Sequence, residues 1–587
     1  MSLQFITGNS GNGKTEYLFN RIVKEAKENP RDNYLVIVPE QFTMQTQRQL
    51  VDLSENKVIM NIDVLSFKRL AYRVFDELGI TNLTVLEETG KNLVLRKLAA
   101  QEADKLGVIG RNLNRIGYIS EVKSLLSELV QYNISPEELG RYIASGRLSD
   151  TLSDKLKDVL VLYEAFEKFM QDKYITAEEI LNVLSNVAEE SAILRNSVIA
   201  FDEFTGFTPI QNQLIKKLFV ISKKIYVTLT IDCREDIFKS RGMQELFDMP
   251  KRTVKSLTEM AAFYGIEVEE PIILDKNYRL AENEELSFME QQLFRKRRCS
   301  FKKVPKHIHI DCLRDPKQEL TKIARRINEL VRNENLRYRD IAIVTGDVNI
   351  YAGYVREIFD KYNIPYFIDA TQEILFHPFI EFIRSIPDIA AQNFSADAVF
   401  RFLRCGFSEL LDSEIDVLEN YVLACGVRGK SAWDKKWVRL PKHKAGYDLE
   451  LLNQSREYIM ELLKPVYQVF SDKKSTVKDY VLAIYKLIVL LDIPDKLAKK
   501  EQALLDAGDQ TASKEYGQIY KIVMQLFEKY VAVLGDECMD TEEFTQILDA
   551  GLDAADVAVI PPGYDTVTIG DIERTRLTNI KVMFLQA

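Results

Sequence analysis

Eight residues near the start of the chain have the types and the spacing of a phosphate-binding loop. They fit the pattern G-x-x-x-x-G-K-[ST]. In such a loop the glycines let backbone N–H groups curl around a β-phosphate at the positive end of the following helix. Lys14 then reaches the β- and γ-phosphates, and the Thr15 hydroxyl becomes a ligand of Mg²⁺. The predicted nucleotide-binding residues of this loop are Gly8, Asn9, Ser10, Gly11, Asn12, Gly13, Lys14 and Thr15.

An acidic pair supplies the second part of such a site. The apolar run at residues 197–201 is followed directly by Asp202 and Glu203. At the end of a strand, Asp202 would hold Mg²⁺ through water, and Glu203 would orient and deprotonate the attacking water. An Asp-Glu pair after an apolar run is more often a solvated strand end. The phosphate-binding loop upstream makes the catalytic interpretation the favoured one.

The segments around the loop have the pattern of an α/β unit. Residues 3–7 predict a short strand that runs into the loop, and residues 15–29 predict an amphipathic helix that ends before Pro30. Residues 34–38 form a continuous apolar run, which is typical of a parallel strand covered on both faces. This position between a strand and a helix disfavours the alternative, a Gly-rich turn that matches the pattern by chance.

The α/β pattern occurs twice, and helices interrupt each occurrence. Further strands are predicted at residues 197–201, 224–230, 307–313, 341–345, 366–368, 566–569 and 581–585. Between these groups the apolar spacing is helical, and Thr176 with Glu179 predicts a capping box that opens a helix. The predicted fold class is α/β, with two α/β domains that each carry a mainly helical insertion. Their predicted boundaries are 1–85 with 191–300, insertion 86–190, 301–378 with 556–587, and insertion 379–555.

Length and charge leave several functions open. The chain has 587 residues, too many for a single core, so we expect several domains. Its formal net charge of −10 neither favours nor excludes nucleic acid, because a large acidic protein can still line one channel with Lys and Arg. The chain stops at Ala587 directly after a predicted strand, so we expect it to be a piece of a longer polypeptide.

Cysteine spacing and hydropathy exclude other classes. The six cysteines are scattered and form no C-x-x-C pair, which argues against a disulfide framework, a zinc site or an iron–sulfur cluster held within this sequence. No apolar run approaches the roughly 20 residues of a membrane span. The first residues lack the basic and long apolar regions of a signal peptide. We therefore expect a cytoplasmic location and no membrane association.

Two segments resemble motifs of superfamily-1 helicases of the UvrD/RecB type. Residues 202–211 resemble the stretch D-E-F-Q-D-T-x-P-x-Q, and residues 277–279 match the N-Y-R motif in which those enzymes place an arginine against the γ-phosphate. The resemblance therefore implies that Gln211 and Arg279 bind nucleotide and that Arg279 acts in catalysis beside Lys14 and Glu203. The planar, permanently charged fork of arginine suits phosphate oxygens. A surface salt bridge is the alternative for Arg279.

Longer phrases resemble the B subunit of AddAB-type helicase–nucleases. They lie at residues 38–43, 64–73 and 204–209, and at 419–424 with Trp433 and Trp437. The resemblance spans the chain and implies two RecA-like domains, ATP and Mg²⁺ as cofactors, and a heterodimer with an A subunit that carries the main motor. Double-strand DNA ends and single-stranded DNA are the implied substrates, processed for recombinational repair. A nuclease domain and an iron–sulfur cluster are implied further toward the C-terminus, outside this sequence.

Several helicase parts are altered. The loop begins at Gly8, which leaves no room upstream for the glutamine motif that reads adenine. Within residues 231–242, Glu235 replaces the glutamine that senses nucleotide. Residues 573–577 lack the histidine and glycine of an H-x-x-K-G motif, and the last motif, with a second arginine, would lie beyond Ala587. Because an arginine finger alone contributes about 10³–10⁵ in rate, we expect nucleotide binding with weak or absent hydrolysis.

Residues that contact DNA are harder to identify. Arg69 and Arg73 are four apart on a predicted helix, and residues 295–298 with Lys302 and Lys303 form a basic run. Phosphate contacts need such charges, but a solvated surface is the more common explanation. Trp433 and Trp437 are predicted to pack in a core rather than to stack on bases.

Three functions remain open on these residues. The first is a helicase-like protein that binds ATP and holds or scans DNA while its partner drives movement. The second is an active translocase, which the intact Lys14, Asp202, Glu203 and Arg279 favour. The third is a P-loop enzyme that acts on a small molecule, and the second α/β domain counts against it.

Overall fold

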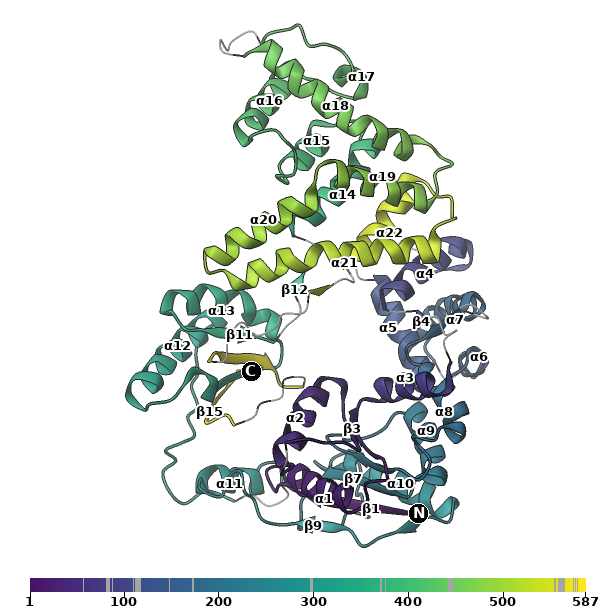
Figure 1. Cartoon of the computed structure of the whole chain (residues 1–587), viewed down its shortest axis with the longest axis vertical. Coiled ribbons are helices and arrows are strands. Elements are labelled where there is room, and N and C mark those ends of the chain that lie inside the picture. The colour runs from purple at the N-terminus through teal and green to yellow at the C-terminus, as the bar shows by residue number, and fades with distance from the viewer. Residues whose placement is uncertain are drawn as a thin grey trace. The chain divides into compact units, whose positions relative to one another are not determined.

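Figure 1 shows the computed structural model of the chain. The chain forms two compact units. Unit 1 comprises Met1–Leu86, Leu125–Arg147 and Glu167–Cys312, and unit 2 comprises Glu87–Ser124, Leu148–Phe166 and Leu313–Ala587. The structure describes residues 1–587 except 56, 81–84, 87, 109, 111–117, 147, 171–173, 296–298, 370–371, 375, 442–446, 554–555, 558–564, 574, 576, 578 and 587. The four-part division predicted from sequence is finer than these two units and stays a prediction.

Unit 1 is built on a seven-stranded parallel sheet. Its order is β3-β2-β6-β7-β1-β8, and β9 also pairs with β1. The strands are β1 Ser2–Gly8, β2 Tyr34–Ile37, β3 Ile62–Leu65, β6 Val198–Phe201, β7 Lys224–Thr230, β8 Glu267–Val268 and β9 Ile272–Leu274. In this register Gly8 lies opposite Thr230, so the loops that follow β1 and β7 leave the sheet side by side.

Helices cover both faces of this sheet because side chains alternate along each strand. On β1, Phe5 belongs to one buried cluster and Ile6 to the other. One cluster packs against α1 Lys14–Glu28 and α2 Thr43–Leu53. The other packs against α3 Phe67–Leu78, α8 Ile180–Val187, α9 Pro209–Ile221 and α10 Asp248–Phe263. The remaining elements that begin in this unit are η1 Glu40–Phe42, β4 Val85–Leu86, α6 Pro136–Ala144, β5 Ile175–Thr176, η4 Ala188–Glu190 and α11 Glu284–Gln292.

Helix α1 follows the predicted pattern closely. Leu18, Phe19, Ile22 and Ala26 form its buried stripe, and it ends at Glu28 before Pro30. Gly13 caps its N-terminus with φ 76° in the left-handed region, where a residue with a side chain would be strained. The local sequence pattern thus determines both the loop and the helix that presents it.

The capping box predicted at Thr176 and Glu179 forms, but one turn outside the helix. The Thr176 N–H donates to Glu179 Oε2 at 2.6 Å, and the Glu179 N–H donates to Thr176 Oγ1 at 3.2 Å. Helix α8 starts only at Ile180, after these bonds have closed a turn. Apart from the short strand pair β4 and β5, the described residues between β3 and β6 are mainly helical. Their further elements are α4 Glu88–Gln101, η2 Ala103–Lys105, α5 Tyr118–Gln131 and α7 Asp150–Met170.

Unit 2 contains a second parallel sheet, so the fold class is α/β as predicted. Its order is β11-β14-β10-β15, with β10 Ile341–Thr345, β11 Tyr366–Ile368, β14 Val567–Asp571 and β15 Val582–Gln586. Helices α12 Pro316–Asn333 and α13 Val348–Tyr362 pack on it through a buried cluster, and η5 Tyr338–Asp340 precedes β10. Each of these strands lies within two residues of its predicted position.

The strand predicted at residues 307–313 is wrong. These residues form no strand, and Ile310 is 94% exposed. Their alternation of apolar and polar types suits a strand, but a strand also needs a neighbour to receive its backbone hydrogen bonds. In the described part of the chain no strand pairs with them. The backbone N–H groups of Lys306 and His307 donate instead to the Glu285 carboxylate, at 2.7 and 2.8 Å.

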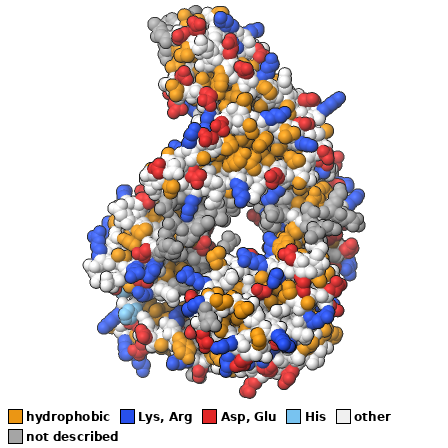
Figure 2. Space-filling view, viewed as in Figure 1, with side chains coloured by type: hydrophobic (Ala, Val, Ile, Leu, Met, Phe, Trp, Pro, Cys, Tyr) orange, Lys and Arg blue, Asp and Glu red, His pale blue; other side chains and the backbone are white. Residues whose placement is uncertain are grey.

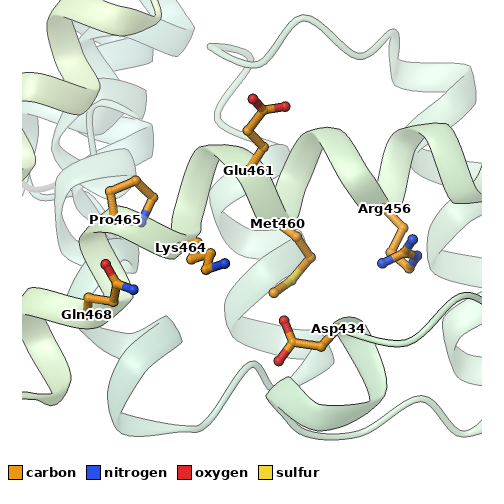
Figure 3. A pocket seen from close by; sticks show the side chains of 7 residues that line it. All are labelled: Asp434, Arg456, Met460, Glu461, Lys464, Pro465 and Gln468. Carbon is orange, nitrogen blue, oxygen red and sulfur yellow. The ribbon is translucent and has the colours of Figure 1, made fainter.

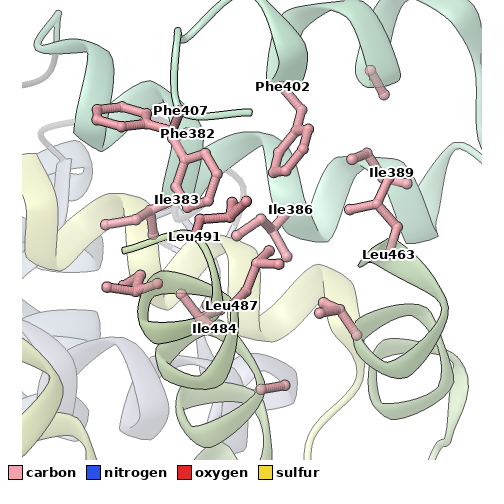
Figure 4. Close-up of a cluster of buried hydrophobic side chains, with 14 of the residues drawn as sticks. Phe382, Ile383, Ile386, Ile389, Phe402, Phe407, Leu463, Ile484, Leu487 and Leu491 are labelled. Carbon is pink, nitrogen blue, oxygen red and sulfur yellow. The ribbon is translucent and has the colours of Figure 1, made fainter. Parts of the chain in front are cut away.

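From residue 372 to residue 557, the described part of unit 2 is mainly helical around one large core (Figure 4). Its elements are α14 Pro378–Ala391, α15 Ala396–Leu403, α16 Asp412–Cys425, α17 Lys430–Trp433, α18 Leu449–Ser471, α19 Val477–Leu490, α20 Ile493–Asp506, α21 Gln510–Leu534 and α22 Thr541–Asp553, with the short pair β12 Gln372–Glu373 and β13 Asp556–Val557. Trp433 and Trp437 lie in this core with ring centroids 5.2 Å apart, which confirms core packing. Among the described residues no helix is long and apolar enough to cross a membrane.

Candidate phosphate-binding site

The loop from Gly8 to Thr15 lies where β1 ends and α1 begins (Figure 1). At Gly8 the backbone passes so close to β9 that a Cβ atom would lie 2.6 Å from the Leu274 carbonyl oxygen. The Asn12 amide donates to that same oxygen at 2.6 Å. The loop is therefore fixed to the strand end on one side and opens toward the carboxyl edge of the sheet, where open α/β sheets bind ligands.

Lys14 bends back over the loop. Its Nζ donates to the Asn9 carbonyl oxygen at 2.9 Å. Burial lowers the pKa of Lys14, while the carboxylates of Glu203 and Asp202 oppose that shift. An ammonium group that has lost part of its hydration is well suited to bind a multiply charged phosphate.

Thr15 joins the loop to the acidic pair at the end of β6. Its Oγ1 lies 3.3 Å from Asp202 Oδ1 and 3.4 Å from Glu203 Oε1. The Thr228 hydroxyl, on β7, also donates to Asp202 Oδ1. Hydroxyl and carboxylate oxygens are the ligands that Mg²⁺ prefers, together with water and substrate phosphates. Among the described residues no cluster of three or more His, Cys, Asp or Glu forms a complete metal cage.

Glu203 has a strained backbone. Its φ is +66°, in the left-handed region that residues with side chains rarely adopt. The turn carries the carboxylate to the side of Thr15 while the Asp202 side chain stays buried. Strain of this kind costs about 1–3 kcal/mol and is concentrated at functional sites.

The segment after β9 covers the loop with the N-Y-R residues. The Asn277 amide donates to the Ser10 carbonyl oxygen at 3.1 Å, and the Tyr278 N–H donates to the Gly11 carbonyl oxygen at 3.0 Å. Arg279 Nη1 lies 3.5 Å from Ser10 Oγ, and its side chain is exposed. The structure thus brings Arg279 to the loop with Lys14, although their roles in catalysis stay predictions.

Gln211 has a local structural role. Its side-chain oxygen accepts the Thr208 N–H at 2.9 Å, and its own N–H donates to Thr208 Oγ1 at 3.4 Å. These two bonds form the capping box of α9. The side-chain oxygen of Gln211 is thus already used in this cap, and the assignment of Gln211 to nucleotide binding stays a prediction.

Glu235 is held by a buried lysine that the sequence alone did not single out. Lys251, 3% exposed on α10, forms ion pairs with Glu235 at 2.7 Å and with Glu245 at 3.3 Å. Burial disfavours the lysine charge, but the two carboxylates outweigh it and raise the pKa of Lys251. The segment that contains Glu235 is therefore fixed to α10 by an ion pair.

The basic residues considered for DNA contact are largely paired. Arg69 Nε contacts Glu40 Oε1 at 3.0 Å, and Arg73 Nε lies 3.9 Å from Asp63 Oδ2. Lys303 pairs with Glu284 at 2.5 Å. On the face shown in Figure 2, basic and acidic side chains are interspersed over the described residues. The Arg295 side chain is 12% exposed and pairs with Asp232 and Glu290. Residues 296–298 lie outside the described residues.

A separate pocket lies in unit 2, beside α18 (Figure 3). It is lined by Asp434, Arg456, Met460, Glu461, Lys464, Pro465 and Gln468. The buried guanidinium of Arg456 donates to the Trp433 carbonyl oxygen at 2.9 Å and to Asn453 Oδ1 at 3.1 Å. The guanidinium of Arg456 is bonded to core residues, and both acidic and basic side chains line the pocket. The pocket therefore presents no set of donors directed at a ligand.

The chain is similar to known proteins along its whole length. Residues 5–290 match a family described as "ADDB, N-terminal". The chain is 39% identical over 594 residues to the B subunit of the ATP-dependent helicase/deoxyribonuclease of Lachnoclostridium phytofermentans, covering 100% of this chain and 52% of that protein. The B subunits of the same name from Caldanaerobacter subterraneus and Clostridium novyi are 32% and 31% identical, again over 100% of this chain and 51% of their own lengths. The chain thus spans about half the length of these relatives.

Proposed function

We propose a function from the premise that the chain belongs to the AddB family of helicase/deoxyribonuclease B subunits. It binds ATP with Mg²⁺ at the loop Gly8–Thr15, and it holds DNA within a two-subunit helicase–nuclease. The observation that carries the proposal is the meeting of Lys14, Thr15, Asp202 and Glu203 at the carboxyl ends of β1 and β6. In a DNA-repair protein of this kind, this is the site at which a nucleotide would bind.

Each side chain has a distinct task in this proposal. Lys14 exchanges its bond to the Asn9 carbonyl oxygen for the phosphates, and the loop N–H groups bind the β-phosphate. Thr15 and Asp202 would hold Mg²⁺, which neutralises phosphate charge when it is bound. Glu203 orients the attacking water, and Arg279 contacts the γ-phosphate. The two parallel sheets would then belong to two RecA-like domains.

We propose DNA holding and scanning, rather than movement, as the main role. Coupling of hydrolysis to movement needs a segment that changes with the state of the nucleotide. In this chain the corresponding Glu235 is fixed to the buried Lys251. The partner A subunit would supply the motor, and the complex would act on double-strand DNA ends and single-stranded DNA during recombinational repair in the cytoplasm.

An active translocase is the second candidate. It is supported by Glu203 and Arg279, which both approach the loop although they come from segments far from it in the sequence.

An iron–sulfur cluster does not fit the residues of this chain, because its described cysteines are scattered and no metal-holding cluster forms among the described residues. A nuclease domain and its cluster are proposed only for the longer polypeptide.

The rate of ATP hydrolysis with and without single-stranded DNA separates the two candidates. The chain, its Lys14→Ala variant and a full-length relative with its partner would be assayed together. Strong stimulation by DNA that Lys14→Ala abolishes would establish a motor and contradict the scanning role. The scanning role predicts that ATP is hydrolysed only by the complex of the relative with its partner. This chain should then bind DNA without hydrolysing ATP.

A further inference from the structure

Asn9, the second residue of the phosphate-binding loop, is bonded through every polar atom of its side chain. The residue is 4% exposed. Its Oδ1 accepts the Cys233 N–H at 2.9 Å, and its Nδ2 donates to Glu290 Oε1 at 2.8 Å. Glu290 lies on α11, 281 positions along the chain. The loop is thus attached to a helix that contributes nothing to its sequence motif.

The contacts continue from Glu290 and return to the loop. Arg295 Nη2 lies 3.7 Å from Glu290 Oε1, and its Nε donates to Asp232 Oδ2 at 3.0 Å. Asp232 is followed directly by Cys233, whose N–H donates to Asn9. Asn9, Glu290, Arg295, Asp232 and Cys233 therefore form a closed polar ring.

The ring is fixed by buried charges. Asp232 is 1% exposed and accepts Arg234 Nε at 2.8 Å as well as Arg295. Burial alone would raise its pKa, but the hydrogen bonds from both arginines hold the pKa of Asp232 at about 2. The Arg295 guanidinium also lies 4.8 Å from the centre of the Phe247 ring. These contacts fix Arg295, whose guanidinium lies beside the Glu290 carboxylate oxygen that also accepts the Asn9 amide.

Asn9 connects this ring to Lys14. The Asn9 carbonyl oxygen accepts Lys14 Nζ, while the Asn9 side chain is bonded to Glu290. Burial lowers the pKa of Lys14, and the negative charge of Glu290 is one of the carboxylate charges that oppose this shift. A change at Glu290 therefore reaches the loop through one hydrogen bond and one electrostatic interaction.

We propose that Glu290 is a positioning residue of the phosphate-binding loop, which holds Asn9, and with it the loop, in the conformation that receives phosphate. The proposal rests on the proposed function, because it assumes that the loop binds a nucleotide. The coupling is reciprocal, so a nucleotide that stabilises the loop also stabilises the contact with α11. A merely structural contact would affect the folding of α11 and leave the loop unchanged.

Hydrogen exchange of the nucleotide-free protein tests the hold on the loop directly. Glu290→Ala removes the acceptor, whereas Glu290→Gln keeps an amide oxygen for Asn9 Nδ2. Glu284→Ala is the matched control, because it removes an exposed acid from the same helix. Glu284 is paired with Lys303 and not with the loop. We expect faster exchange, by about tenfold, in peptides containing residues 9–13 and 233 for Glu290→Ala only. Glu290→Gln should recover most of the protection.

The affinity for Mg·ATP, measured by calorimetry, provides the second readout. Glu290→Ala should weaken it by about tenfold, with Glu290→Gln and Glu284→Ala within about twofold of the unmodified chain. If Glu290→Ala does not fold, Asn9→Asp replaces it in the exchange experiment, because an aspartate can still accept the Cys233 N–H but cannot donate to Glu290.

The outcomes separate the two proposals. If loop exchange in Glu290→Ala equals that in Glu284→Ala, the positioning role is wrong, whatever the affinity for ATP. If the unmodified chain binds no ATP although Glu290→Ala loosens the loop, the nucleotide-binding function is wrong and the hold of Glu290 on the loop stands. If Glu290→Gln behaves like Glu290→Ala, the charge of Glu290 rather than its hydrogen bond acts on the loop, which contradicts the proposed route through Asn9.

Discussion

Thr15 Oγ1 lies 3.3 Å from Asp202 Oδ1, although 187 positions separate the two residues in the chain. The parallel sheet explains the meeting, since β1 and β6 both end at its carboxyl edge and β7 lies between them. These two oxygens would hold Mg²⁺ if the ion binds at the loop, and the ion would there neutralise phosphate charge. A local motif and a distant strand end thereby form one candidate site.

Asp202→Asn should reduce the contribution of Mg²⁺ to ATP binding. The amide keeps the shape of the side chain and removes its charge, so we expect about tenfold weaker affinity in excess Mg²⁺. In EDTA the variant and the unmodified chain should bind ATP equally, because no metal is then present to be held. Calorimetric titrations in both buffers measure this. An equal loss of affinity in EDTA would instead show that Asp202 maintains the loop itself.

Lys251→Met should destabilise unit 1. The change leaves Glu235 and Glu245 without their buried partner, and loss of one member of a buried ion pair costs about 3–5 kcal/mol. Because Glu235 is partly exposed, we expect the low end of that range. Chemical denaturation followed by circular dichroism measures the loss in free energy of unfolding. The double variant that combines Lys251→Met with Glu235→Gln should recover part of this loss.

Lys255→Met is the control for this change on the same helix. Lys255 lies 3.9 Å from Glu259, and both side chains are 68% exposed. Exposed pairs contribute little, so its free energy of unfolding should shift by less than about 0.5 kcal/mol. Equal effects of the two substitutions would show that the buried pair contributes nothing particular to stability.

The loop and its acidic partner could be predicted from sequence because their patterns are local. A loop motif, an apolar strand and an Asp-Glu pair each occupy fewer than about ten consecutive residues. The bonds of Glu290 to Asn9 and of Lys251 to Glu235 could not be predicted, since nothing in the local sequence identifies a partner across the fold.

The strand wrongly predicted at residues 307–313 has the same physical cause. Its alternation is a local property, but strand formation depends on a neighbour from elsewhere in the chain. In contrast, the core position predicted for Trp433 and Trp437 is confirmed, and burying two large aromatic side chains removes much apolar surface from water.

His377 should make unit 2 less stable in mild acid. Burial lowers its pKa to about 4, below the usual value of 6.5. The unfolded chain therefore binds a proton more readily than the folded one, so stability is greatest above pH 6.5 and falls as the pH decreases toward 4.

The substitution His377→Asn tests this pH dependence. His377 Nδ1 accepts the Phe379 N–H at 3.1 Å at the start of α14, and an asparagine side chain can keep that cap without titrating. The unmodified chain should lose about 3 kcal/mol between pH 6.5 and 4 that the variant does not lose. Denaturation at a series of pH values measures the difference, and parallel pH profiles would rule out His377 as the cause.

Calorimetric binding of Mg·ATP to the unmodified chain and to Lys14→Ala tests the central claim most directly. The ammonium group of Lys14 is half-buried beside the loop and turns back toward it. We predict saturable binding of one ATP by the unmodified chain, and at least about a hundredfold weaker binding by Lys14→Ala at an unchanged melting temperature. Equal affinity of the two proteins, or no heat of binding with either, would contradict a nucleotide site at this loop.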